Sequence, residues 1–296
     1  MSQPAAAALA VKKYKKKSQL REIWRRLKKN RAAMLGLAIF AVIVFCTIFA
    51  DCITPYEMAL KQNAAERLQT SSFEHWFGTD RLGRDIFARV VHATRNSLIM
   101  GIGAVVVGVA FGSLFGSVAG FYGGKADSLI MRSMDTVICI PFMMLALCIV
   151  AALGPGLINV LIALMIANIP YYTRLVRSAI LNIAGQDYIE AARSCNAPDY
   201  KIILKHVLPN AIGPIIITAT MSTGNIILNA SAMSFLGMGI QPPAPEWGSM
   251  LAESKDYMMY APHIMIFPGI AIGLTALSLN LLGDGLRDAL DPKLKD

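Results

Sequence analysis

The amino-acid sequence predicts an all-α protein that crosses a membrane six times. Of its 296 residues, 55% are hydrophobic and only 16% are charged, whereas soluble domains usually carry about 25% charged residues. A membrane helix needs about 20 apolar residues, and five charge-free windows approach or exceed this length, at 32–50, 97–124, 136–173, 207–245 and 257–283. The same composition excludes a disordered chain and a secreted domain held together by disulfides.

Two of these windows are too long for a single membrane helix. Window 136–173 contains Leu153-Gly154-Pro155-Gly156, which predicts two helices joined by a tight turn. Window 207–245 ends in a proline-rich segment, so one helix followed by a loop is expected there. Residues 1–31 form a basic tail that precedes a membrane domain over 32–296. The predicted membrane helices cover 32–50, 97–122, 137–153, 157–173, 212–236 and 263–283.

The distribution of charge predicts the orientation of the chain. Residues 1–31 contain eleven Lys or Arg and one acidic residue, so this tail carries +10 within a total net charge of +9. Such a tail can bind nucleic acid or anionic lipid, but a membrane helix follows at once, which favours a role in orientation. Lys and Arg then place both termini and the loops 125–135 and 174–210 in the cytoplasm, and no nucleic-acid partner is expected.

Glycine recurs at every fourth position along the second predicted membrane helix. This spacing places the glycines on one helical face, where the missing side chains let a neighbouring helix approach closely. The stripe is interpreted either as helix packing within the chain or as an interface that slides or lines a pathway. Its members are Gly108, Gly112, Gly116, Gly120 and Gly124.

The sequence contains none of the motifs that would power or catalyse a reaction. It has no GxxxxGK[ST] phosphate-binding loop, no HExxH or GxSxG motif, and no acidic or basic residue inside a predicted membrane helix. A secondary transporter usually keeps such charges as ion relays, and a membrane-embedded enzyme needs a nucleophile or a metal site. We therefore expect a partner that supplies energy, and we assign no catalytic residue, metal or cofactor to this chain.

The long inner loop is predicted to hold a short capped helix. Asp187 and Glu190 have the spacing of a capping box at a helix start. Asn196 suits the left-handed conformation in which helices often end. A second helix over 200–208 is expected to end at Pro209. Such a loop is either an ordinary solvated connector or a docking surface for a cytoplasmic protein.

Several short segments together resemble one protein family. Glu190-Ala191-Ala192, followed by Asn196 and Val207-Leu208-Pro209, is similar to the EAA loop of ABC importer permeases. This family usually has Gly where the chain has Asn196, but Asn also tolerates the left-handed conformation. The chain further resembles the second permease of dipeptide, oligopeptide and nickel importers in three segments, His75–Asp85, Ser234–Gly248 and Asn280–Lys293.

The resemblance implies a type I ABC importer permease fold in the cytoplasmic (inner) membrane, without enzymatic activity in this chain. The implied cargo is a di- or oligopeptide, with nickel, glutathione or another small molecule as alternatives. The implied partners are a homologous permease subunit, two cytosolic ATPases that bind ATP and Mg²⁺, an extracytoplasmic substrate-binding protein and the lipid bilayer. A heterodimer of permeases is favoured over a homodimer.

In this family the helix of the inner loop is a coupling helix that docks on an ATPase. By resemblance, Glu190 and Arg193 are its polar contacts, and Ala191 and Ala192 allow a close approach. The residues implied in docking are Asp187, Tyr188, Glu190, Ala191, Ala192, Arg193 and Asn196.

The outer segments form a second candidate surface. An amphipathic pattern that begins at Leu82 predicts an interfacial helix. The alternative is a loop folded over the helix ends, in which Asp80, Arg84 and Asp85 pair with one another. No residue is assigned to the substrate pathway. The candidate contacts for a substrate-binding protein are Asp80, Arg84, Asp85, Glu246 and Trp247.

Overall fold

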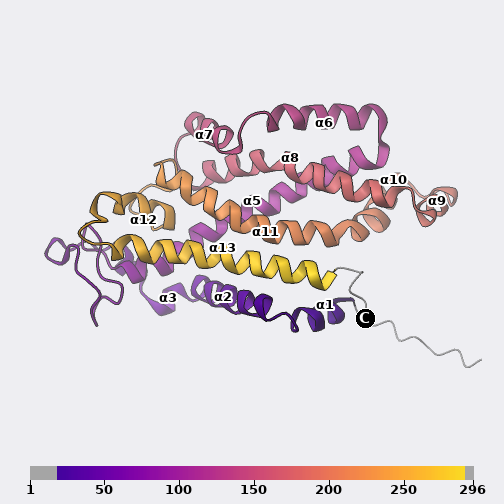
Figure 1. Cartoon of the computed structure of the whole chain (residues 1–296). Helices are drawn as coiled ribbons and strands as arrows, with labels where there is room; N and C mark the ends of the chain where they lie inside the picture. Colours follow the sequence, from indigo (N-terminus) through magenta and orange to yellow (C-terminus); the bar gives the residue numbers. More distant parts are fainter. Residues whose placement is uncertain (1–18, 291–296) are drawn as a thin grey trace, which may run out of the picture.

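The computed structural model describes residues 19–290 of the chain. In this part helices make up almost all of the regular structure, and the long ones lie side by side along a common direction (Figure 1). The all-α prediction is thereby confirmed for these residues. Of the predicted basic tail, residues 1–18 lie outside the described residues, as does the end of the last family-like segment, 291–293.

The described helices differ widely in length. The short ones are α1 Gln19–Leu27, α3 Ala50–Ile53, α4 Tyr56–Leu60, α9 Asp187–Ser194, α10 Asp199–Ile202 and α12 Trp247–Ser254. The longer ones are α2 Arg31–Ile48, α5 Ile86–Tyr122, α6 Gly124–Ile138, α7 Phe142–Leu153, α8 Leu157–Ala184, α11 Leu208–Phe235 and α13 His263–Leu290. Short 3-10 turns at Ala64–Glu66 and Lys255–Tyr257 and a π-helical turn at Ile203–Val207 complete the set.

Five helical stretches of residues 19–290 are long and apolar enough to cross a membrane. They are α2, α5, α8, the continuous run of α10 and α11, and α13. A sixth candidate consists of α6 and α7, which qualify only as a pair and are bent by 83° at a short break. The six predicted spans thus correspond to five unbroken helical stretches and one broken pair.

The predicted span 137–153 was expected to be one helix, but the structure divides these residues between the end of α6 and α7. Helix α6 ends at Ile138, and α7 begins at Phe142 directly after Pro141. Proline has no amide hydrogen, and its ring disfavours helical backbone at the preceding residue, so a straight helix cannot continue through this point. Residues 125–135, predicted as an inner loop, are helical and form most of α6; their location on the cytoplasmic side stays a prediction.

Three helices extend beyond the charge-free windows. α5 begins at Ile86 and includes most of the predicted interfacial helix, while α8 continues to Ala184 and α13 to Leu290. Some charged side chains in these extensions have partners from other elements; for example, Nη2 of Arg95 lies 2.8 Å from Oδ2 of Asp51. The charge-free windows therefore mark the apolar middle of each helix and do not mark its ends.

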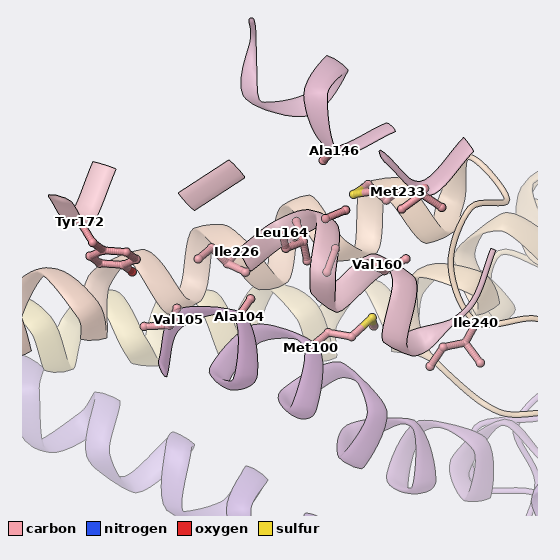
Figure 2. Close-up of a cluster of buried hydrophobic side chains, with 13 residues drawn as sticks. Met100, Ala104, Val105, Ala146, Val160, Leu164, Tyr172, Ile226, Met233 and Ile240 are labelled. Carbon is pink, nitrogen blue, oxygen red and sulfur yellow. The ribbon is translucent and has the colours of Figure 1, made fainter. Parts of the chain in front are cut away.

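The central hydrophobic core is built by α5, α7, α8 and α11 (Figure 2). Each helix contributes small or aliphatic side chains, and α13 packs beside α11 and α2 to complete the bundle (Figure 1). The buried members of the core that Figure 2 labels are Met100, Ala104, Val105, Ala146, Val160, Leu164, Tyr172, Ile226, Met233 and Ile240.

Four glycines of α5 bring this helix into close contact with α8. A Cβ atom added at Gly116 would lie 2.7 Å from the carbonyl oxygen of Thr173, which is closer than atoms can pack. Gly108, Gly112 and Gly120 also face α8, and an added Cβ atom would crowd that helix at each of them. The stripe therefore serves helix packing within the chain.

Gly124, the fifth glycine of the predicted stripe, does not belong to this contact. An added Cβ atom there would have no heavy atom within 4 Å. Gly123 and Gly124 instead have φ angles of +64° and +57°, which glycine adopts without steric cost. They form the turn between α5 and α6, so the stripe ends where α5 ends.

The two ends of the bundle carry different structures (Figure 1). At one end, α3, α4, α12 and the connecting loops form a cap, which comprises residues 49–85 and 237–262. At the other end, α9 and α10 project as an arm, which comprises residues 185–207. The arm lies at the same end as α1 and the C-terminal end of α13 (Figure 1).

Replacing Gly116 by Leu is expected to force α5 away from α8. Overpacking of this kind typically costs about 1–3 kcal/mol, so the purified protein should unfold at a lower temperature and accumulate less in the membrane. The control is Gly273→Leu, at an exposed position of α13 with no heavy atom within 4 Å of an added Cβ. If both variants melt at the wild-type temperature, the α5–α8 contact tolerates a side chain.

Candidate functional site

Helix α9 forms the tip of the arm. It starts at Asp187, whereas the capping box predicted Asp187 as the cap and the first helical residue as Tyr188. Its N-cap is Gln186, whose extended backbone (φ −86°, ψ 146°) makes no side-chain capping bond. The predicted capping box is therefore wrong, because Asp187 is already helical. Asp187 and Glu190 lie in the first turn, where their carboxylates interact favourably with the positive end of the helix dipole.

The end of α9 follows the prediction for Asn196. This residue adopts a φ of +56°, and the next residue, Ala197, donates its amide hydrogen to the carbonyl oxygen of Ala192 at 3.2 Å. A bond that reaches back five residues around a left-handed residue is typical of a Schellman C-cap. Asn196 therefore provides the left-handed turn that ends α9.

The two faces of α9 have different surroundings. Ile189 is fully buried in a cluster that joins the arm to the ends of α5 and α8, and Ala192 packs against the same cluster. The guanidinium carbon of Arg193 lies 4.7 Å from the ring centre of Phe121 on α5. The exposed residues available to a partner include Asp187, Tyr188, Glu190 and Ala191, and Arg193 is exposed as well.

The arm continues into α11 without a break. The second loop helix was expected over 200–208 and to end at Pro209; these residues are helical as predicted, but the end at Pro209 is wrong. α10 passes through the π-helical turn Ile203–Val207 into α11, where Pro209 lies in the first turn. The π-helical turn ends two residues before Pro209, which has no amide hydrogen to donate, and such turns accommodate local breaks in the helical hydrogen-bond pattern. The C-terminal side of the arm is therefore attached to a membrane helix.

A cavity of about 480 Å³ lies between the α6–α7 break, α8 and α11. About half of its lining residues are apolar, and the polar part consists of Arg174 and five uncharged side chains: Asn168, Tyr171, Ser222, Asn225 and Asn229. Sequence reasoning did not find these residues. The sequence pattern that could have indicated them is the spacing of Ser222, Asn225 and Asn229, because residues three and four apart on a helix share one face.

A network of buried charges holds the cap together. Nε of Arg84 lies 2.6 Å from Oδ2 of Asp80, and the same guanidinium also donates to Glu253 of α12. Nη2 of Arg89 lies 3.3 Å from the same Glu253 carboxylate. Both arginine side chains are essentially inaccessible to solvent. Two cations and two anions thus compensate one another inside the cap.

The other predicted contacts for a binding protein also have internal roles. Oδ1 of Asp85 accepts the amide hydrogen of Ala88 at 2.7 Å and so caps α5. Glu246 is fully buried and caps α12 by accepting two backbone amide hydrogens at 2.8 Å. Burial raises the pKa of the Glu246 carboxyl, and these two hydrogen bonds oppose that rise.

Trp247 is 2% exposed, and its indole N–H donates to the carbonyl oxygen of Val90 at 3.1 Å. Asp80, Arg84, Asp85, Glu246 and Trp247 are all buried, so they offer no surface to a binding protein in this structure. The alternative prediction, a loop folded over the helix ends, describes the cap, and Asp80 pairs with Arg84 as predicted. Asp85 does not pair with Arg84, because its Oδ2 lies 2.8 Å from Nδ1 of His75.

These features define a class of protein. A bundle of membrane helices with a cavity between them and a helix that projects beyond one end is the architecture of a transport subunit. Residues 112–296 match the family model described as "Binding-protein-dependent transport system inner membrane component", and residues 18–70 match "N-terminal TM domain of oligopeptide transport permease C". The chain belongs to this family of inner-membrane components and is an ABC importer permease subunit.

Similar proteins with curated names are transport permeases. The dipeptide transport system permease protein DppC of Alkalihalophilus pseudofirmus is 46% identical over 94% of this chain and 91% of its own length. The di/tripeptide transport system permease protein DppC of Pseudomonas aeruginosa is 43% identical over 94% of each chain. The glutathione transport system permease protein GsiD of Escherichia coli is 45% identical over 93% of this chain and 90% of its own.

The fold also resembles that of a solved ABC transporter. A chain of the MetNI methionine ABC transporter, in an inward-facing conformation, covers 70% of this chain and 98% of its own length. The TM-score is 0.59 and the sequence identity 19%, so this likeness concerns the fold alone. The predicted ABC importer permease fold is confirmed.

Asn196→Gly is expected to leave the arm intact, and Asn196→Val to destabilise it. Glycine adopts a positive φ freely, whereas a left-handed conformation costs other residues roughly 1–2 kcal/mol, and β-branched side chains tolerate it poorly. Limited proteolysis of the arm measures the effect. The control is Asn182→Val, the same change at an exposed helical position of α8. Equal protection of both valine variants would contradict the strain argument.

Proposed function

We propose that this subunit carries di- and oligopeptides across the cytoplasmic membrane and is driven by two partner ATPases. It hydrolyses no nucleotide itself. The observation that carries the proposal is α9, a helix with an exposed face at the tip of the arm, in a chain whose sequence lacks a phosphate-binding loop. Transport against a gradient then requires that ATP hydrolysis in another subunit act on this chain.

The exposed face of α9 is suited to a groove on an ATPase. Tyr188 offers an aromatic ring that is 41% exposed, and Glu190 and Asp187 offer carboxylates beside it. Ala191 leaves room for a neighbouring backbone. Helix-in-groove contacts use this combination of one large apolar side chain, small residues and a few charges.

Two observations support a peptide cargo. The curated relatives described above are named for dipeptides, di- and tripeptides, or glutathione, which is itself a tripeptide. The cavity is lined by the amide side chains of Asn168, Asn225 and Asn229, each of which has a donor and an acceptor that can pair with a peptide bond. Its lining contains no Cys, His, Asp or Glu, so it is poorly suited to a bare nickel ion.

The cavity also supports a partner permease. Its lining comes from α6, α7, α8 and α11, and Asn225 on its wall is exposed. Polar side chains in a membrane helix normally face a partner or water and not lipid. A homologous permease on this side would close the cavity from lipid, and a substrate-binding protein would deliver peptide at the cap.

Replacing Glu190 by Lys should weaken ATPase docking, because it reverses the charge on the exposed face of α9. A lost contact worth about 1.4 kcal/mol lowers affinity tenfold, so we expect co-purified ATPase to fall by about tenfold or more, together with peptide uptake. The control is Asp284→Lys, the same charge reversal at an exposed position near the end of α13. Unchanged ATPase co-purification and uptake in Glu190→Lys would refute the docking assignment.

The cargo is tested by competition in the reconstituted importer. Uptake of a labelled dipeptide should be inhibited by an unlabelled tripeptide and by glutathione, and should be unaffected by an equal concentration of Ni²⁺. The control is uptake with an ATPase subunit that binds but does not hydrolyse ATP. Competition by Ni²⁺ and not by peptides would replace the peptide assignment with a metal one.

A further inference from the structure

Helix α6 is attached to the bundle differently from every other long helix in the described part of the chain. None of its residues, from Gly124 to Ile138, is buried. It is bounded at one end by the Gly123–Gly124 turn and at the other by the 83° break before α7. An added Cβ atom at either glycine would meet no neighbour. The helix therefore lacks the interdigitated packing that holds α5 against α8.

Two ion pairs to α8 replace that packing. Arg177 donates through Nε and Nη2 to the two carboxylate oxygens of Asp127, at 2.5 and 2.6 Å. One turn along α8, Nη2 of Arg174 lies 2.5 Å from Oδ1 of Asp135. Bidentate arginine–carboxylate pairs fix geometry well, and partly exposed pairs of this kind can break and re-form. The position of α6 relative to α8 is thus set by breakable polar contacts.

Arg193 connects the arm to the end of α5, next to the turn at which α6 begins. Its guanidinium stacks over the ring of Phe121, which is 7% exposed and stands two residues before the Gly123–Gly124 turn. Arginine is the cation that stacks best on aromatic rings, because its planar group can lie flat against the ring. The resemblance assigns Arg193 to the ATPase, and this assignment stays a prediction; in this structure the residue is exposed and its guanidinium contacts Phe121 near the end of α5.

The far end of α6 borders the cavity. Val137 and Ile138, in its last turn, line the space that Asn225 and Asn229 of α11 face. A helix that is loosely held along its length and hinged at a glycine pair can move at this end when it is displaced at the other. The path from α9 therefore runs through the Arg193–Phe121 contact to the end of α5, across the Gly123–Gly124 turn, and along α6 to the cavity wall.

We infer that Arg193 and Arg177 are positioning residues that transmit displacement of α9 to α6 and so set access to the cavity. The inference rests on the proposed docking of an ATPase on α9. Arg193 links the arm to the end of α5, and Arg177 links α8 to the start of α6. Neither side chain contacts cargo or nucleotide in this role.

The test uses the assembled importer in liposomes, with wild-type ATPases, partner permease and binding protein. The readout is the number of dipeptides imported per ATP hydrolysed. Coupling between sites typically amounts to fivefold or more, so Arg193→Gln and Phe121→Leu should lower this ratio at least about fivefold while the amount of co-purified ATPase stays unchanged. Phe121→Trp, which keeps an aromatic face, should retain the wild-type ratio.

Charge exchange tests the second contact. Asp127→Arg should lower the ratio, and the double variant Asp127→Arg with Arg177→Asp should restore it, because the ion pair is rebuilt in reverse. The control is Lys201→Gln, which removes an exposed cation from α10 of the same arm. A melting temperature is recorded for every variant, so that loss of folding is separated from loss of coupling.

Two results would overturn the inference. If Arg193→Gln releases the ATPase, the residue contacts the ATPase directly; if the ratio is unchanged in Arg193→Gln and Asp127→Arg, α6 is not part of the link. Failure of the proposed function has a different signature, since the wild-type importer would then import no dipeptide. In that case ATP hydrolysis stimulated by the binding protein replaces uptake as the readout for the same variants.

Discussion

The close packing of α5 on α8 is the contact on which the rest of this structure depends. Lipid provides no hydrophobic force between helices, so membrane helices associate through tight packing, which small residues favour. Four glycines of α5 allow this packing along much of its length. α5 continues into the cap at one end and meets the arm and α6 at the other. The α5–α8 contact therefore fixes the positions of the cap and the arm relative to each other.

The two ends use charge in different ways. In the cap, Arg84 and Arg89 are buried with Asp80 and Glu253, and removing one partner of such a group typically costs about 3–5 kcal/mol. Near the arm, the pairs of Arg174 and Arg177 with α6 are partly exposed and correspondingly weaker. The cap is therefore built to be rigid, and the end that faces the proposed ATPase is built to be adjustable.

Particular residues explain where sequence-based prediction succeeded and failed. The Gly154–Gly156 turn and the left-handed Asn196 were predicted correctly, because both follow from local backbone preferences. The capping box at Asp187 failed because Gln186 takes the cap position instead. The sequence predicted that the membrane helix starts at residue 97, because Arg89 and Arg95 interrupt the apolar sequence before it. The structure starts α5 at Ile86, since Glu253 and Asp51, which are distant in the chain, pair with these two arginines.

The sequence by itself determined the all-α membrane class, the turn positions, the family and the helix that projects from the bundle, because composition, spacing and local propensity act within a few residues. Only the tertiary structure decided which glycines pack, that the charges of the cap face inward, that Arg193 stacks on Phe121, and that asparagines of two helices share a cavity. Each of these depends on which residues become neighbours when helices far apart in the chain come together, and no local pattern contains that information.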